Sequence, residues 1–90
     1  MIKDIYRQSE DCLFEDMGGD ILLYHPATAK ATQLNESSRI VWQLCDGERT
    51  VGEIIESISQ AYPDQAGQVS EDVRWSIKML SENQVLELTN

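Results

Sequence analysis

Hydrophobic residues in the first third of the chain fall into short runs separated by glycine and small polar residues. Two such runs lie at residues 12–17 and 21–24. The intervening Gly18-Gly19-Asp20 supplies the positive φ angles of a tight turn, so the pattern predicts a β-hairpin. His25-Pro26 ends its second strand.

A third short strand is predicted at residues 30–34, after a loop of small residues. Ala31, Thr32 and Gln33 are small or polar, which would leave the backbone accessible if this strand lies at a sheet edge. Residues 1–11 mix charge and apolarity without a clear period. We expect them to form a loosely held arm.

From residue 35 onward the spacing becomes helical, and it predicts helices at residues 36–45, 51–62 and 71–83. The second helix has one apolar stripe, formed by Val51, Ile54, Ile55, Ile58 and Tyr62. The core stripe of the third consists of Val73, Ile77 and Leu80.

Capping residues set the limits of these helices. Asn35 is placed to cap the first helix, and Asp46-Gly47 is placed to stop it. Thr50 with Glu53 three residues later forms a capping box, which predicts a tight corner between the first two helices. Pro63 ends the second helix, and a polar loop at residues 64–69 leads to Ser70 as the N-cap of the third.

Three short antiparallel strands followed by three helices predict an α+β fold of the winged helix-turn-helix type. Ninety residues are expected to form one domain, residues 1–90. A chain of this size has little core in which to form a deep catalytic pocket, so its size favours a binding site on the surface.

The third helix carries a second stripe about 100° from its core stripe. Its members are Asp72, Trp75, Ser76, Met79 and Asn83. Trp75 and Met79 either pack against the N-terminal sheet or line a groove beside an edge strand, where a rigid ring and a flexible thioether would accept varied apolar side chains. Trp42, on the first helix, is expected in the core.

The net charge of −9 bears on the class of partner. Residues 1–34 carry 3 basic and 6 acidic side chains, and residues 35–90 carry 4 and 10, so neither part is basic. Contact with phosphates requires Lys and Arg, so this balance opposes nucleic acid or an anionic membrane as the partner. The acidic surface serves solubility, or attracts a partner with a basic segment.

The reactive side chains show no catalytic spacing. Cys12 and Cys45 lie 33 residues apart without metal-ligand spacing, and we interpret them as reduced thiols of a cytoplasmic protein. His25 is interpreted as a solvated turn histidine. No metal, phosphate-loop or cofactor motif is found, and no apolar stretch is long enough to span a membrane. We therefore expect a protein that is not an enzyme and needs no cofactor.

One stretch carries a family resemblance. The segment Leu34-Asn35-Glu36-Ser37, together with a set of residues downstream, resembles the PqqD family. The downstream set is Ile40, Leu44, Asp46-Gly47, Thr50-Val51 and Glu53-Ile54-Ile55. PqqD belongs to pyrroloquinoline quinone biosynthesis, and PqqD-like domains recognise peptides in other pathways that modify ribosomally made peptides. The resemblance covers roughly residues 10–88.

The resemblance implies a peptide chaperone, which binds the leader of a precursor peptide and presents it to a maturation enzyme of the radical S-adenosylmethionine (SAM) class. A leader-removing protease or a cyclising enzyme is an alternative partner. The peptide would add as a strand to the sheet edge beside the third helix. The implied binding residues are Lys30, Ala31, Thr32, Gln33, Leu34, Asp72, Trp75, Ser76 and Met79. We expect a monomer or a weak dimer.

A rival of another class is a winged-helix DNA-binding regulator. It fits the predicted fold but not the charge, because the helix that would enter the groove bears three acidic and two basic side chains. These are Glu71, Asp72 and Glu82 against Arg74 and Lys78.

Overall fold

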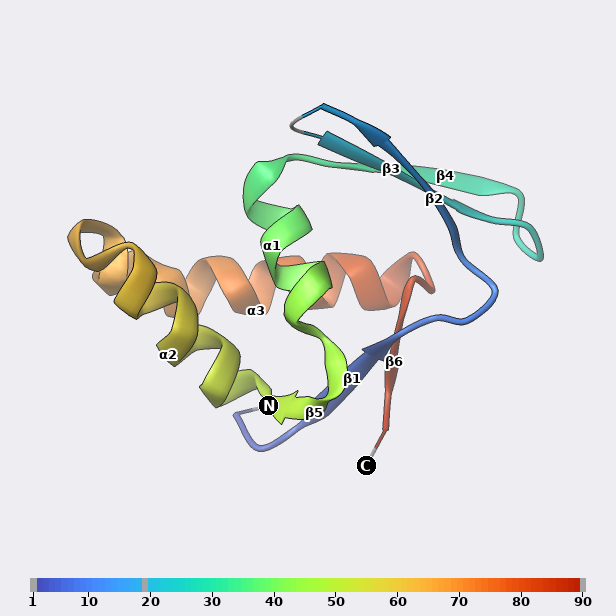
Figure 1. The fold of residues 1–90 in the computed structure, drawn as a ribbon. Coiled ribbons are helices and arrows are strands. Elements are labelled where there is room, and N and C mark those ends of the chain that lie inside the picture. The colour runs from blue at the N-terminus through green and yellow to red at the C-terminus, as the bar shows by residue number, and fades with distance from the viewer. Residues whose placement is uncertain (1, 19, 90) are drawn as a thin grey trace.

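The computed structural model describes residues 2–18 and 20–89 (Figure 1). Its strands are β1 (Ile5–Gln8), β2 (Leu13–Met17), β3 (Asp20–His25), β4 (Lys30–Leu34), β5 (Asp46–Thr50) and β6 (Leu86–Leu88). Its helices are α1 (Glu36–Leu44), α2 (Val51–Ala61) and α3 (Ala66–Glu82), with a short 3-10 turn, η1 (Pro63–Gln65), before α3. Within these ranges, no helix combines the length and apolar character that crossing a bilayer demands.

The predicted hairpin and third strand form one antiparallel sheet in the order β2-β3-β4. Ile21 of β3 lies opposite Leu34 of β4, and Tyr24 lies opposite Ala31. Since side chains alternate across a strand, Ile21 and Leu34 share the inner face, where both are buried, and Tyr24 and Ala31 share the outer face. Because β4 is the outermost strand in this order, the expectation that residues 30–34 form an edge strand is confirmed.

A second sheet, in the order β5-β1-β6, uses segments from the two ends and the middle of the chain. Arg7 of β1 pairs with Asp46 on one side and with Glu87 on the other. The expectation that residues 1–11 form a loose arm is thus wrong for β1. Its partners lie about 40 and 80 residues away, so no local period reveals the pairing.

The first two helices follow their capping signals. The side chain of Asn35 accepts a hydrogen bond from the amide of Ser38, at 3.0 Å. Thr50 and Glu53 make both hydrogen bonds of the capping box, at 2.9 and 3.1 Å. Gly47 has a φ of 84°, and the short link between the helices is strand β5. That strand pairs with β1 and was not predicted from the sequence.

The third helix begins at Ala66, five residues before the predicted start at position 71. Ser70 is therefore not an N-cap but lies within the helix. The turn η1 redirects the chain after α2, and Val69 extends the core stripe by one helical turn, since it lies four residues before Val73 and both are buried. Burial of Val69 offsets the weak helix propensity of the polar residues beside it.

The core lies between the inner face of the β2-β3-β4 sheet and the three helices. It contains the predicted stripe of α3 and Trp42, which is only 5% exposed. The interpretation of His25 as a solvated turn histidine is wrong, because this residue is buried. It occupies the last position of β3, two residues after Leu23, and so falls on the inner face.

Candidate functional site

The open edge of β4 is the first part of the candidate site. β4 pairs with β3 on one side only, so its other side presents backbone amides and carbonyls. Among the predicted residues on it, Lys30, Ala31 and Gln33 are exposed, Thr32 is half-buried and Leu34 is buried. Leu34 therefore anchors the strand to the core while the preceding residues remain accessible.

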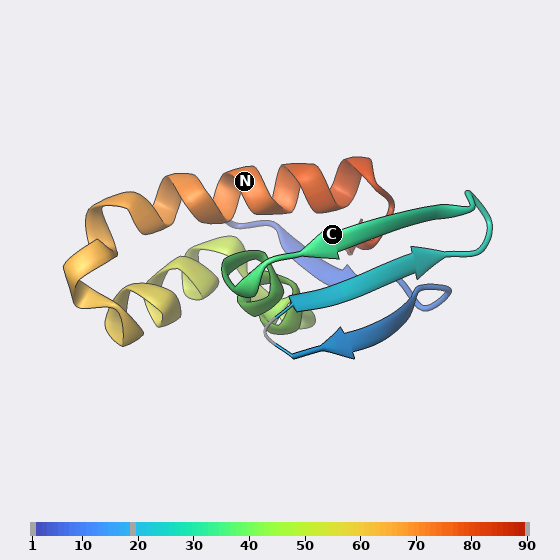
Figure 2. The same ribbon diagram turned by 90° about the horizontal axis from the view of Figure 1, so that it is seen from above.

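The third helix is the second part. Figure 2 shows β4 as the strand of its sheet nearest to α3, and in Figure 1 α3 passes beneath that sheet. Trp75 is 63% exposed on this helix, so the interpretation that it packs into the core is wrong. Met79 is half-buried against the core cluster. The two side chains together give α3 a partly uncovered apolar flank.

A pocket of about 250 Å³ is the third part, and it lies where α1 faces the corner between α2 and α3. Its lining residues are Glu36, Ser37, Ile40, Val41, Ile58, Tyr62, Gln65, Val69, Asp72, Val73 and Ser76. Two predicted site residues, Asp72 and Ser76, are brought together here. Trp75, Met79 and the β4 residues do not line it.

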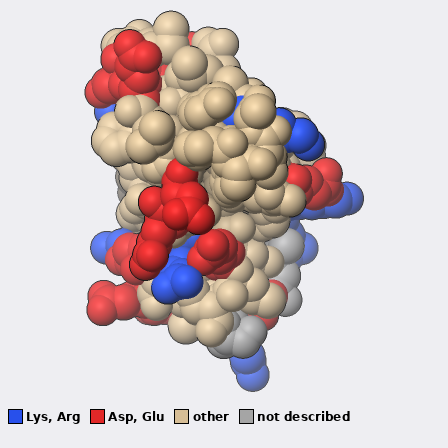
Figure 3. Space-filling model, turned by 90° about the vertical axis from the view of Figure 1, so that its right-hand side faces the viewer, with Lys and Arg blue, Asp and Glu red and all other residues tan. Residues whose placement is uncertain are grey.

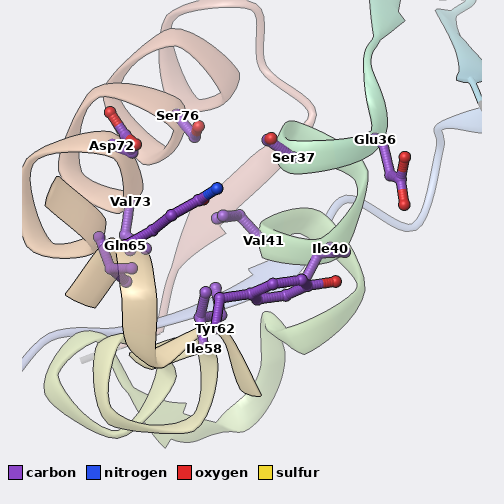
Figure 4. Close-up of a pocket in the computed structure, with 11 residues that line it drawn as sticks. Glu36, Ser37, Ile40, Val41, Ile58, Tyr62, Gln65, Asp72, Val73 and Ser76 are labelled. Carbon is purple, nitrogen blue, oxygen red and sulfur yellow. The ribbon is translucent and has the colours of Figure 1, made fainter. Parts of the chain in front are cut away.

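The lining of the pocket combines apolar and polar side chains. Figure 4 shows the side chain of Gln65 reaching toward Val41 across the pocket, with the ring of Tyr62 on one side and Asp72 at the edge. The hydroxyl of Ser76 lies 3.5 Å from that of Ser38 on α1, and both serines are buried. This polar contact joins α1 to α3 beside the pocket.

Local sequence explains how the pocket is built. The amide of Tyr62 donates to the carbonyl of Ile58 at the end of α2, and Pro63 then starts the 3-10 turn. Gln65 precedes α3 without capping it through its side chain. The side chain is thus available to extend over the pocket, and the turn brings Tyr62 opposite α1.

The opposite edge of the same sheet, β2, has a different character. Glu15 and Asp16 occupy its middle, and Arg39 forms an ion pair with Asp16 at 3.3 Å. Arg39 also donates to the carbonyl of Gly18. Figure 2 shows β2 on the far side of β3 from α3. The β4 edge is thus the edge nearer to α3, whereas the β2 edge contacts α1 through Arg39.

The charged and titratable groups give the site its electrostatic setting. Figure 3 shows one face on which Lys and Arg are scattered singly among acidic and uncharged side chains. Burial raises the pKa of Cys45 to about 12, so this thiol stays protonated at neutral pH. Burial also raises the pKa of Cys12. No set of three His, Cys, Asp or Glu residues within residues 2–18 and 20–89 is arranged to hold a metal ion.

Sequence reasoning did not identify most of the pocket. Its residues come from four elements, and only the packing of α1 against the α2–α3 corner brings them together. Tyr62 ends the apolar stripe predicted for the second helix, directly before Pro63, and the structure shows it 44% exposed at the border of the pocket.

Comparison with known proteins places this geometry in context. Residues 20–86 match the model of the family described as coenzyme PQQ synthesis protein D (PqqD). A curated relative, the PqqA binding protein of Rahnella aquatilis, is 35% identical over 69 residues, which are 77% of this chain and 61% of that protein. This chain thus matches less than two thirds of the relative's length.

A solved structure shares the fold. It is that of TbiB1 in complex with the TbiA(beta) leader peptide, with a TM-score of 0.77 and 21% identity over 90% of this chain and 94% of the other. The winged helix-turn-helix-like α+β architecture predicted from the sequence is the fold of that structure.

Proposed function

This chain belongs to the PqqD family, and from that premise we propose that it is a non-catalytic chaperone for a ribosomally made precursor peptide. It binds the leader region of the precursor as an added strand on β4. It then presents the peptide to a maturation enzyme. The names of the two similar proteins support this proposal, since one binds PqqA and the other holds a leader peptide.

The observation that carries the proposal is the open edge of β4 beside the exposed face of α3. An extended peptide paired with β4 would gain main-chain hydrogen bonds whatever its sequence. Alternate side chains of such a strand point to opposite faces, so one set would meet the flank of α3. There Trp75, 63% exposed, and Met79 offer apolar contact, and Asp72 offers polar contact, whereas Ser76 is buried against Ser38.

The shape of the edge favours a modest contact. β4 has five residues, so the added strand would be short. An interface of this kind buries on the order of 1,200 Å² or less, and its affinity rests on one or two anchors. We expect a Kd between about 1 μM and tens of nanomolar.

The enzyme partner is proposed to be a radical SAM enzyme, as the family resemblance implies. A protease or a cyclising enzyme is the alternative. Precursor peptides are made by ribosomes, so we propose that the protein acts in the cytoplasm. It acts as a monomer or weak dimer, and the chemistry belongs to its partner.

The experiment uses a synthetic leader peptide of PqqA, the peptide named for the similar Rahnella aquatilis protein, with a scrambled leader as control. Isothermal titration calorimetry should give one-to-one binding of the leader in the stated range and none of the scrambled peptide. Titration of the leader into Thr32→Pro and into Gln33→Pro then tests the edge, since the amide of only one of these adjacent residues faces it. Equal binding of both leaders, or full binding by both proline variants with their folds intact, would refute the proposal.

A further inference from the structure

We infer that the pocket between α1 and the α2–α3 corner holds the side chain of one Lys or Arg from the bound peptide. The inference rests on the proposed function and adds a position-specific preference to it. The basic residue would lie in the flank of the peptide next to the carboxyl end of β4, beyond the paired strand. Main-chain pairing alone gives no such preference.

The size of the pocket fits a single side chain. Sites for drug-sized ligands and cofactors measure about 300 to 1,000 Å³, and this pocket measures about 250 Å³. Five of its lining residues are aliphatic, and they come from all three helices: Ile40, Val41, Ile58, Val69 and Val73. A linear aliphatic stem of three or four methylene groups would pack against these residues.

The charge of the border favours a cation at the end of that stem. Asp72 lies on the α3 side of the pocket and Glu36 on the α1 side, whereas no Lys or Arg is among the lining residues. Figure 4 shows Glu36 directed outward, so its carboxylate adds negative potential near the pocket, and Asp72 supplies a second carboxylate from α3. Gln65 and Ser37 supply further oxygen acceptors.

Other side chains would fit less well. An acidic side chain would be repelled by the carboxylates of Asp72 and Glu36. A wholly aliphatic or aromatic side chain could pack against the apolar lining but would gain no charge interaction with Asp72, which is exposed at the border. Lys and Arg bury their stems and keep the charged group at the surface, so they match an apolar interior with an acidic border.

The place of the pocket relative to β4 determines which part of the peptide reaches it. Leu34 ends β4, and Glu36 and Ser37, only two and three residues later, already line the pocket. A peptide strand advances about 3.3 Å per residue. Its side chain should therefore enter the pocket within a few residues of the end of the paired segment.

The test selects binders from an mRNA-display library of random 12-residue peptides against three proteins. They are the parent chain, Asp72→Asn and Glu71→Gln. The last is the matched control, since it makes the same charge change one position away at a residue that does not line the pocket. Asp72 and Glu71 are both exposed, so neither change should disturb folding, and a 1H–15N spectrum of each variant checks this.

For the parent and Glu71→Gln, selected peptides should carry Lys or Arg at one fixed position beside an alternating segment. Replacing that Lys by norleucine, which keeps the stem and removes the charge, should weaken binding to the parent by about three- to tenfold. With Asp72→Asn the same replacement should change the Kd by less than about twofold. The difference should shrink as salt is raised.

Two outcomes would overturn the inference while leaving the proposed function in place. One is that selected peptides lose affinity for Thr32→Pro but show no basic position. The other is that the norleucine effect is the same with Asp72→Asn. If no peptide is enriched, or if the enriched peptides bind both Thr32→Pro and Gln33→Pro as well as they bind the parent, the proposed function fails together with the inference.

Discussion

Replacing Trp75 by alanine separates a binding role from a structural one. Trp75 is 63% exposed in the free protein, whereas Val73 and Ile77 beside it are buried. The change therefore removes a side chain that the core barely uses. If a peptide lies between β4 and α3, the same side chain becomes one of its main apolar contacts.

The magnitudes follow from the exposed fraction. A Trp side chain offers up to about 250 Å², so about 160 Å² is exposed and about 90 Å² is already covered. Complete coverage by a peptide would give up to about 4 kcal/mol at 25 cal/mol per Å², and incomplete coverage and ordering costs reduce this to about 1 to 3 kcal/mol. The lost packing within the free protein should cost at most about 2 kcal/mol of the free energy of unfolding, since alanine keeps part of the contact.

The assay is calorimetric titration of the leader peptide into the parent and into Trp75→Ala, with urea unfolding of both proteins. The Kd should rise about 5- to 150-fold while the cooperative unfolding transition remains. Arg74→Ala is the control, because its exposed side chain lies about 100° around the helix. It should change the Kd by less than twofold. An unchanged Kd for Trp75→Ala, or an unfolded variant, would refute the assignment of the α3 flank.

The remaining predictions concern the edge, the thiols, one carboxylate and nucleic acid. The backbone amides of adjacent residues in an antiparallel strand face the partner strand and the open edge in turn. Of Thr32→Pro and Gln33→Pro, one should therefore weaken peptide binding by about 0.5 to 1.5 kcal/mol, and the other should mainly destabilise the fold. Equal effects of the two variants on peptide titration and on urea unfolding would contradict this. Replacing Cys12 and Cys45 by alanine should cost about 1 to 3 kcal/mol of stability in urea unfolding without loss of peptide binding; metal bound to the parent and lost from the double variant would count against it. The carboxylate of Asp46 accepts hydrogen bonds from the amides of Glu48 and Arg49, and these bonds lower the pKa of Asp46. The contribution of Asp46 to stability is therefore present above its ordinary pKa and is lost as pH falls through the lowered value. Because Asp46 is exposed, Asp46→Ala should cost no more than about 1 kcal/mol near pH 7 and less near pH 2, and a cost that grows on acidification would be contrary evidence. In a gel-shift assay at physiological salt, the net charge of −9 should prevent saturable duplex binding at low micromolar protein, and such binding would refute that expectation.

Features specified by neighbouring residues were predictable from the sequence. The cap at Asn35 and the capping box of Thr50 and Glu53 each depend on residues three positions apart, so the local sequence contains the whole signal. The β4 edge was predictable for a similar reason, because its small and polar residues directly precede the helix start. The α3 core stripe followed from its period.

Features made by distant segments were not predictable in this way. β1 pairs with β5 and β6, and nothing within residues 1–11 indicates partners so far along the chain. The early start of α3 depends on burial of Val69, which tertiary packing decides. His25 was misassigned because its place in β3 extends the strand by one residue beyond the predicted end. The pocket likewise exists only after the helices pack.

The most direct test of strand addition is a set of intermolecular nuclear Overhauser effects between 13C,15N-labelled protein and unlabelled leader peptide. We predict contacts from backbone protons of Ala31, Thr32 and Gln33 to every second residue of one extended peptide segment. Contacts from Trp75 should reach side chains of the same segment. Contacts confined to β2 or to α2, with none to β4, would contradict the account.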